Sequence, residues 1–416
     1  MIWKGTSAGK ARKLHDGCLD SIVVTDQYIL TGAKDCTLNV LTKSYITSLA
    51  IDLKKLLPDS VLPKPQAIDM TTDSKTIIIG TLGQEIYQVS TKDLKLNNNT
   101  KFQVKEILKS HYAPNLKYTN EVWGLCVLSD GDRFLSCSAD GTLRQWSISE
   151  RKQLNFLSLN IDQSGQTLPV DSQTKDLQTM AKLRCVGVSP DDTIASVGCE
   201  DGTLRIIDVT EWQQIKIHKD RNARCTEVKF SPNGKYMACG FEDCYIDIFI
   251  VPEMRRIYAM RKHSSYITHI DWSMDSVFLQ SNCGGHELLF WDIASGKQLS
   301  TGGTVLRNNE WSTWSCVLGW PVQGIWNEKE MDENDINMVD RSHETFYNEY
   351  KIIATADDSS NVRLYKYPCL KKGSESVIGK GHSSYVTNVK WCLKDEYLVS
   401  TGGEDQCVML WKVDKE

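Results

Sequence analysis

Long apolar runs are missing from this sequence: none approaches the length of about 18 residues that a membrane-spanning helix needs. The first residues also form no apolar signal segment. The fourteen cysteines never occur at Cys-x-x-Cys spacing, and many lie inside apolar, strand-like runs. Buried free thiols in a reducing compartment account for this pattern better than a disulfide framework or a zinc site. We therefore expect a cytosolic protein without a membrane span.

An excess of positive charge is missing as well. Lysine and arginine number 48 against 53 aspartates and glutamates, which gives a net charge of −5. Non-specific nucleic-acid binding needs a net basic face, so this class of function is disfavoured. The phosphate-binding, G-x-S-x-G, H-E-x-x-H and dinucleotide-binding patterns are also absent. We expect no catalytic, cofactor-binding or metal-binding residues, and hence no enzyme.

The sequence does contain a repeat. Its clearest copy runs from Gly381 to Trp411: it opens on Gly-His, continues through three short strand-like runs, and has Asp405 six residues before Trp411. This is the layout of a WD-repeat blade, and a period near 40 residues predicts a propeller. We identify eight such units, of which the second and seventh are irregular. They lie near residues 18–42, 66–90, 121–148, 182–209, 224–251, 266–293, 310–367 and 385–413.

The predicted fold is an all-β WD-repeat β-propeller: one ring over residues 15–416 with eight four-stranded blades. Seven blades are the alternative if unit two or unit seven is not a true blade. The last unit lacks a fourth strand, and we expect the N-terminal residues 1–14, through segment 10–14, to supply it and close the ring. Four polar insertions interrupt the period, and the last carries an acidic run within residues 328–340 whose role the sequence leaves open. The insertions are 52–64, 93–119, 160–180 and 327–349.

A histidine, an aspartate, a serine or threonine and a tryptophan recur at similar places in the units. In WD-repeat blades these four groups form a hydrogen-bonded chain, which gives each buried polar group a partner. Because the set recurs in several copies, we interpret it as blade architecture rather than as a hydrolase triad. In unit six, Gly285 stands where the aspartate is expected, so we expect apolar packing there instead. The predicted members are His382, Thr401, Asp405 and Trp411 in unit eight, and His111, Ser136, Asp140 and Trp146 in unit three.

One group of basic residues stands out against the acidic total charge. It lies in the connections into units five and six, and such connections of neighbouring blades emerge on the same face of a propeller. We expect one patch that steers an acidic protein partner, with a solvated rim without a partner as the alternative. The residues are Lys216, Lys219, Arg221, Arg224, Arg261 and Lys262.

Several stretches are more specific than WD-repeat spacing alone: EVWGLCVL from Glu121, HSSYITHIDW from His263, EWSTWSCVLGWPVQGIW from Glu310, DINMVDRSH from Asp335, LYKYPC from Leu364 and GHSSYVTNVKW from Gly381. On these stretches the chain resembles the C-terminal propeller of the echinoderm microtubule-associated protein-like family. The resemblance implies a tandem-propeller protein of the cytoskeleton, with another propeller ahead of this one, and paired propellers that contact tubulin.

We therefore expect a non-enzymatic scaffold of a microtubule-associated protein, cytoplasmic and cytoskeletal, that binds protein partners through loops on a rigid ring. Tubulin is the expected partner, whereas nucleic acid, membrane and cofactors are not expected. A generic WD-repeat adaptor of a non-cytoskeletal complex is the alternative, because it shares the fold.

Overall fold

The structure is a computed structural model of the 416-residue chain. It describes residues 3–4, 7–8, 13–43, 48–58, 60, 62–91, 100–112, 120–159, 181–326, 335–346 and 349–414. Over these residues the chain is almost entirely β-structure, and no helix in them is long and apolar enough to cross a membrane. All fourteen cysteines are free thiols, most of them buried.

The described chain divides into two compact units, Met1–Asn115 and Leu116–Glu416. They are called the first unit and the second unit below, whereas the eight repeats keep their names unit one to unit eight. This corrects the predicted single ring over 15–416. The blade pattern specifies how strands pair within one sheet, because strand pairing depends on local apolar alternation and turn residues. It does not specify which sheet packs on which, so units one and two could not be assigned to a separate body from the pattern alone.

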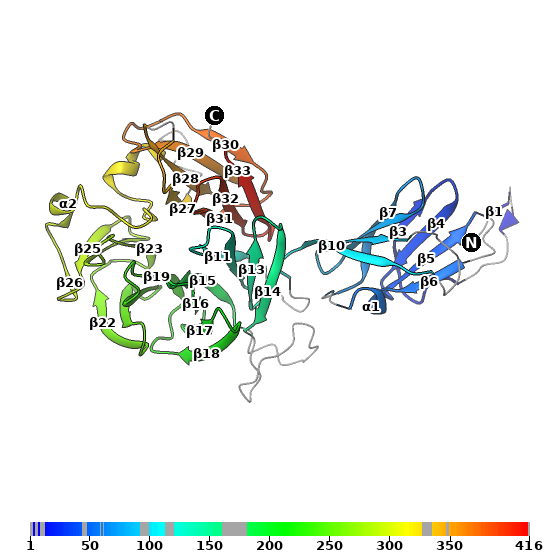
Figure 1. Cartoon of the computed structure of the whole chain (residues 1–416), viewed down its shortest axis with the longest axis horizontal. Helices are drawn as coiled ribbons and strands as arrows, with labels where there is room; N and C mark the ends of the chain where they lie inside the picture. Colours follow the sequence, from blue (N-terminus) through cyan, green and yellow to red (C-terminus); the bar gives the residue numbers. More distant parts are fainter. Residues whose placement is uncertain are drawn as a thin grey trace. The chain divides into compact units, whose positions relative to one another are not determined.

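The first unit contains two four-stranded antiparallel sheets and a short hairpin (Figure 1). The two sheets share one hydrophobic core, with Leu38, Ile51, Ile79 and Tyr87 among its buried residues. The strands are β1 (Trp3–Lys4), β2 (Ser7–Ala8), β3 (Leu19–Val24), β4 (Tyr28–Ala33), β5 (Thr37–Thr42), β6 (Ser48–Asp52), β7 (Pro65–Met70), β8 (Thr76–Thr81), β9 (Glu85–Ser90) and β10 (Gln103–Lys109), and helix α1 is Leu53–Leu56.

The second unit contains six antiparallel sheets, which Figure 1 shows arranged around a common centre. Five have four strands in chain order, and the last has three. The sheets are β11 (Val122–Val127), β12 (Arg133–Ser138), β13 (Thr142–Ser147), β14 (Lys152–Ser158); β15 (Leu183–Val188), β16 (Ile194–Cys199), β17 (Leu204–Asp208), β18 (Gln213–His218); β19 (Cys225–Phe230), β20 (Tyr236–Phe241), β21 (Tyr245–Ile250), β22 (Arg255–Arg261); β23 (Ile267–Trp272), β24 (Phe278–Cys283), β25 (Leu288–Asp292), β26 (Lys297–Gln298); β27 (Ile336–Arg341), β28 (Lys351–Asp357), β29 (Asn361–Tyr367), β30 (Val377–Lys380); and β31 (Val386–Trp391), β32 (Tyr397–Gly402), β33 (Val408–Lys412).

The first and last sheets of the second unit pack against each other. Leu125 and Phe134 of the first share a buried cluster with Cys392 and Val399. Strand β31 also bonds to the backbone of β11: the Thr387 hydroxyl donates to the Val122 carbonyl, and Asn388 Nδ2 donates to the Trp123 carbonyl at 3.1 Å. The first and last sheets of the second unit are therefore in direct contact.

The predicted fourth strand of the last sheet is not found among the described residues. Residues 10–12 of the segment expected to supply it lie outside the described residues, and Lys13 and Leu14 are in no strand. The Leu14 carbonyl accepts a hydrogen bond from Asn39 Nδ2 at 2.9 Å, and His15 bonds to Thr31 at 2.8 Å. Leu14 and His15 therefore bond to the first unit, where their own repeat lies.

The seventh unit also differs from the prediction. Its first strand is β27, whereas the tryptophan-rich stretch 311–320 that we expected to form it is largely irregular. This stretch lies between strands β23 and β27: Ser312 N donates to the Trp272 carbonyl at 2.8 Å, and Arg341 N donates to the Thr313 carbonyl at 3.1 Å. Short helices α2 (Gly302–Val305) and η2 (Trp320–Ile325) flank it. Core packing explains two of its tryptophans, Trp311 and Trp314, which are buried.

Candidate interaction site

Every sheet of the second unit has an irregularity at the same place in its first strand. The pairing with the second strand shifts register by one residue just after the first pair, which leaves one residue in a β-bulge. A bulge redirects the side chain that it carries. The bulged residues are Trp123, Arg184, Thr226, Thr268, Asn337 and Thr387, and all except Thr268 line a central cavity of about 460 Å³.

Two of the bulged side chains are much larger than the others and stack on each other at the cavity. The Arg184 guanidinium lies 3.8 Å from the centroid of the Trp123 ring, and the centroid of the Tyr385 ring lies 6.0 Å from the same ring. Trp123 Nε1 donates to Glu121 Oε2 at 2.6 Å, which fixes the indole. The other sheets place threonine or asparagine at this position, so the cavity has one aromatic and cationic side.

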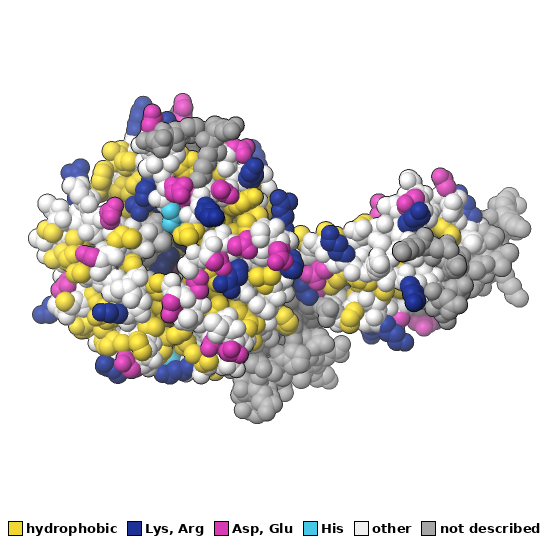
Figure 2. Space-filling view, in the orientation of Figure 1, with side chains coloured by type: hydrophobic (Ala, Val, Ile, Leu, Met, Phe, Trp, Pro, Cys, Tyr) yellow, Lys and Arg dark blue, Asp and Glu magenta, His cyan; other side chains and the backbone are white. Residues whose placement is uncertain are grey.

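Charged side chains also line the same cavity. Lys390 Nζ bonds to Asp340 Oδ1 at 3.0 Å, and Lys229 Nζ lies 3.6 Å from Glu227 Oε1. Burial raises the pKa of Glu227, although the ammonium of Lys229 opposes this, and burial lowers the pKa of Lys390. Figure 2 shows the hollow at the centre of the second unit, with basic side chains inside it.

The predicted network of unit eight is present with one substitution. His382 Nδ1 bonds to Asp405 Oδ2 at 2.8 Å, His382 Nε2 bonds to Ser400 Oγ at 2.7 Å, and Trp411 Nε1 donates to Ser400 Oγ at 2.8 Å. The strand residue is thus Ser400, and Thr401 was the wrong choice. Side chains alternate along a strand, so Thr401 points to the opposite face, where its hydroxyl bonds to Thr387 at 2.8 Å.

In unit three, Trp146 Nε1 donates to Ser136 Oγ at 2.8 Å, as the pattern predicts. Asp140 accepts hydrogen bonds from both the backbone and the hydroxyl of Thr142. His111 is buried, but it belongs to the first unit and stands eleven residues before Val122, whereas His382 stands four residues before Val386. Its part in the network therefore stays a prediction.

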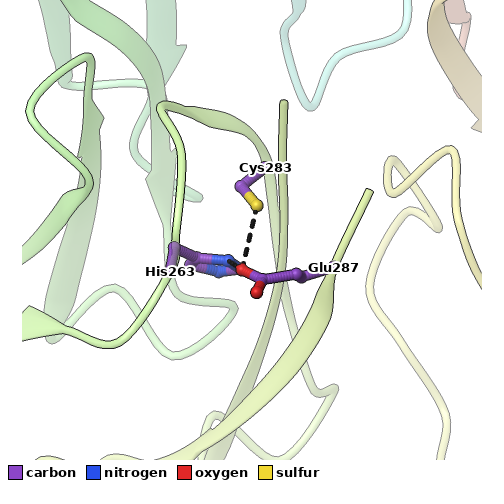
Figure 3. Close-up of side chains that lie close together, drawn as sticks. All are labelled: His263, Cys283 and Glu287. Atoms are coloured by element: carbon purple, nitrogen blue, oxygen red, sulfur yellow. Dashed lines mark hydrogen bonds and ion pairs between the residues drawn. The ribbon is translucent and has the colours of Figure 1, made fainter. Parts of the chain in front are cut away.

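Unit six keeps the network that we expected to be missing there. His263 Nε2 bonds to Ser281 Oγ at 2.7 Å, and Trp291 Nε1 donates to the same oxygen at 2.8 Å. Glu287 replaces the missing aspartate: its Oε2 lies 3.3 Å from His263 Nδ1 and accepts from Ser264 N at 2.9 Å (Figure 3). The longer glutamate side chain reaches the site from two residues beyond Gly285, a replacement that a search for aspartate misses.

Three of the six residues of the predicted basic patch form hydrogen bonds within the chain. Arg221 bonds to Asp247 and Asp243, Arg224 NH2 bonds to Glu242 Oε1 at 3.1 Å, and Lys216 Nζ donates to the Glu253 carbonyl at 3.3 Å. Arg261 and Arg221 both lie over the ring of Tyr245, at 5.3 and 3.8 Å. Lys219 and Lys262 are exposed, and for all six residues a partner-binding role stays a prediction.

Arg221 also has a structural role within the sheet of unit five. It stands four residues before Cys225, the first residue of β19, as His263 stands before Ile267 and His382 before Val386. Its guanidinium therefore takes the place of the histidine in unit five and binds the carboxylates of that sheet. The signal in the sequence is the spacing of four residues between this position and the first residue of the sheet's first strand. It can be recognised only when the start of that strand is known.

Replacing Ser400 by alanine should lower the free energy of unfolding of the second unit by about 1–3 kcal/mol, because buried His382 and Trp411 both lose a partner. Urea unfolding followed by tryptophan fluorescence measures the change, since eleven of the twelve tryptophans lie in this unit. Ser383→Ala is the matched control: that side chain is exposed, and we expect a change within about 0.5 kcal/mol. Equal stability of the two variants would contradict the network's contribution.

Antiparallel sheets set around a central cavity, with a repeated hydrogen-bonded chain inside the sheets, define a β-propeller of the WD-repeat class. The model of the second β-propeller of echinoderm microtubule-associated protein matches residues 122–413. The chain belongs to the echinoderm microtubule-associated protein-like family.

The curated relatives agree with this assignment. The chain is 34% identical to echinoderm microtubule-associated protein-like 4 of Homo sapiens over 300 residues, which are 71% of this chain and 28% of that protein. It is 33% identical to echinoderm microtubule-associated protein-like 3 of Mus musculus, over 80% of this chain and 34% of that protein. It is 32% identical to echinoderm microtubule-associated protein-like 2 of Homo sapiens, over 80% of this chain and 46% of that protein. The matched part thus spans less than half the length of these relatives.

A solved structure, "Structure of U3-55K", shares the fold. It superposes with a TM-score of 0.51 over 72% of this chain and 93% of that chain, at 13% sequence identity. This likeness concerns the fold alone. The family match covers residues 122–413, and the residues that line the central cavity of this chain all lie within that range.

Proposed function

We propose that the second unit is a rigid, closed ring that binds a protein partner at the mouth of its central cavity, as the scaffold part of a microtubule-associated protein. Closure is supported by the shared cluster and hydrogen bonds between its first and last sheets. A closed ring holds its loops and bulged residues in fixed positions, so little conformational entropy is lost when a partner binds.

The observation that carries the proposal is the stack of Trp123, Arg184 and Tyr385. Tryptophan, tyrosine and arginine are the residues that most often dominate the binding energy of protein interfaces. Here each is partly buried and oriented by its neighbours before any partner binds, while the equivalent position in three other sheets carries only threonine.

We propose tubulin as the partner, and the cytoplasm and cytoskeleton as the location. The support is membership of a family named for association with microtubules. A generic adaptor of another complex shares the fold and the stacked residues, so the partner itself must be tested.

Size-exclusion chromatography with purified tubulin tests both parts. We expect the chain to co-elute with tubulin, and the double variant Trp123→Ala/Arg184→Ala to bind at least about tenfold more weakly, the factor that follows from losing about 1.4 kcal/mol or more at a hot spot. Lys219→Ala/Lys262→Ala is the control and should bind as the wild type does. Loss of binding in the control alone would place the contact on the basic residues, and no binding by the wild type would favour the adaptor.

A further inference from the structure

Unit six brings together three side chains of the kinds that bind transition metals. His263 precedes β23, Cys283 ends β24 and Glu287 precedes β25 (Figure 3). One nitrogen, one sulfur and one carboxylate oxygen of these residues lie within 4.8 Å of one another. The sequence shows no metal-binding spacing motif here, because His263 lies in a different connection from Cys283 and Glu287.

The separations between these atoms fit a tetrahedral ion. Zinc bonds of about 2.0–2.3 Å place neighbouring ligand atoms roughly 3.3–3.7 Å apart. Glu287 Oε2 lies 3.3 Å from His263 Nδ1 and 3.2 Å from Cys283 Sγ. These two separations are within a few tenths of an ångström of the values expected around zinc, and the histidine nitrogen and the Cys283 sulfur lie within 4.8 Å of each other.

The surroundings orient the histidine for this role. A metal-bound histidine usually donates its other ring N–H to a fixed acceptor. Ser281 Oγ lies 2.7 Å from His263 Nε2, and the Trp291 indole N–H holds that oxygen in place at 2.8 Å. If His263 carries its proton on Nε2, the lone pair of Nδ1 faces Glu287 and Cys283. The His263 side chain is fully buried, whereas Glu287 is 36% exposed, which leaves an approach from solvent.

The last sheet supplies an internal comparison. Gly402 pairs with Val386 just as Cys283 pairs with Ile267, so the two positions are equivalent. A side chain at Gly402 would meet His382 Nδ1 and Asp405, which shows that this position points into the histidine–acid pair. In the last sheet the pair closes directly, at 2.8 Å. Unit six has a thiol at that position and a pair opened to 3.3 Å.

We propose that His263, Cys283 and Glu287 bind one Zn²⁺ ion per chain, with water in the fourth position. A nitrogen, thiolate and carboxylate set suits zinc, whereas calcium and magnesium require oxygen ligands. The thiol proton, which now points to Glu287, is released to solvent when the Zn–S bond forms. The ion ties the connection before β23 to the turn before β25, on the same sheet whose first strand carries Thr268.

Titration of the chelator-stripped full chain with Zn²⁺, in competition with a chromophoric chelator, tests the site. We expect one tight equivalent in the wild type. Since loss of an outer-shell partner alone costs about 10–100-fold, Cys283→Ser should weaken binding by at least about 100-fold. Co²⁺ should give a thiolate-to-metal absorption band in the wild type that is absent from Cys283→Ser.

Two further measurements distinguish this site from binding by other thiols or from misfolding. Cys407→Ser changes a partly buried thiol in the corresponding turn of the last sheet and should keep the equivalent and the absorption band. Cys283→Ser should keep the wild-type melting curve without metal, because the last sheet forms the same network around a glycine. The proposal is overturned if the stripped wild type takes up no zinc, if Cys283→Ser binds as tightly as the wild type, or if Cys407→Ser removes the same equivalent.

Discussion

Replacing Arg221 by alanine should destabilise the second unit by about 3 kcal/mol, the lower end of the range for a broken buried ion pair. Arg221 Nε and NH2 bond to the two oxygens of Asp247 at 2.8 and 2.7 Å, and NH1 bonds to Asp243 at 2.9 Å. The Asp247 side chain is fully buried. Arg256 NH1, at 3.1 Å from Asp247, would remain, which is why the upper end of the range is not expected.

Urea unfolding followed by tryptophan fluorescence measures this effect. Lys219→Ala is the matched control, because this exposed side chain lies in the same connection and its loss should change stability by less than about 0.5 kcal/mol. Arg221→Glu should be worse than Arg221→Ala, since it adds a like charge beside Asp243 and Asp247. A stable Arg221→Ala variant with reduced affinity for an acidic protein would instead support the basic-patch interpretation.

The repeat predicted most of the first three strands of each sheet, because blade strands show local alternation of apolar and polar residues and end at glycine or aspartate turns. In unit three, for example, the run VWGLCVL from Val122 corresponds to β11, and TLRQW to most of β13. Each such strand is specified by neighbours in the sequence. The division at Asn115 depends on which sheets pack together, and that is decided by side-chain contacts far apart in the sequence, such as Leu125 with Val399.

The site was harder to predict than the sheets. The bulge places Trp123 and Arg184 at the cavity, yet period-two alternation assumes a regular strand and assigns every side chain after the bulge to the wrong face. The choice of Thr401 has a different cause. Thr401 pairs with Val408 across the turn between β32 and β33, which is one residue longer than the turn between Cys137 and Leu143. Counting back from Trp411 as from Trp146 therefore gives Thr401 and not Ser400. Glu287 was missed, and Arg221 was assigned only to the basic patch, because each performs the function of a different residue type, aspartate and histidine, at a position that only the folded strands define.

Replacing Lys390 by methionine should lower the free energy of unfolding of the second unit by about 3–5 kcal/mol. The Lys390 and Asp340 side chains are only 9% and 5% exposed, and their ion pair is 3.0 Å long. Methionine fills most of the volume, so the loss is chiefly electrostatic: Asp340 would keep the Trp391 backbone N–H at 2.8 Å but would have lost its cation inside the cavity. Glu227 would also lose one of the two ammonium groups that favour its ionised form.

The double variant Lys390→Met/Asp340→Asn separates the charge effect from packing. The asparagine oxygen can still accept from Trp391 N, but no buried charge is left unpaired, so the double variant should be more stable than Lys390→Met alone. Urea unfolding of the wild type, both single variants and the double variant gives the coupling free energy of the pair. Strictly additive losses would mean that the two charges do not stabilise each other and would contradict this prediction.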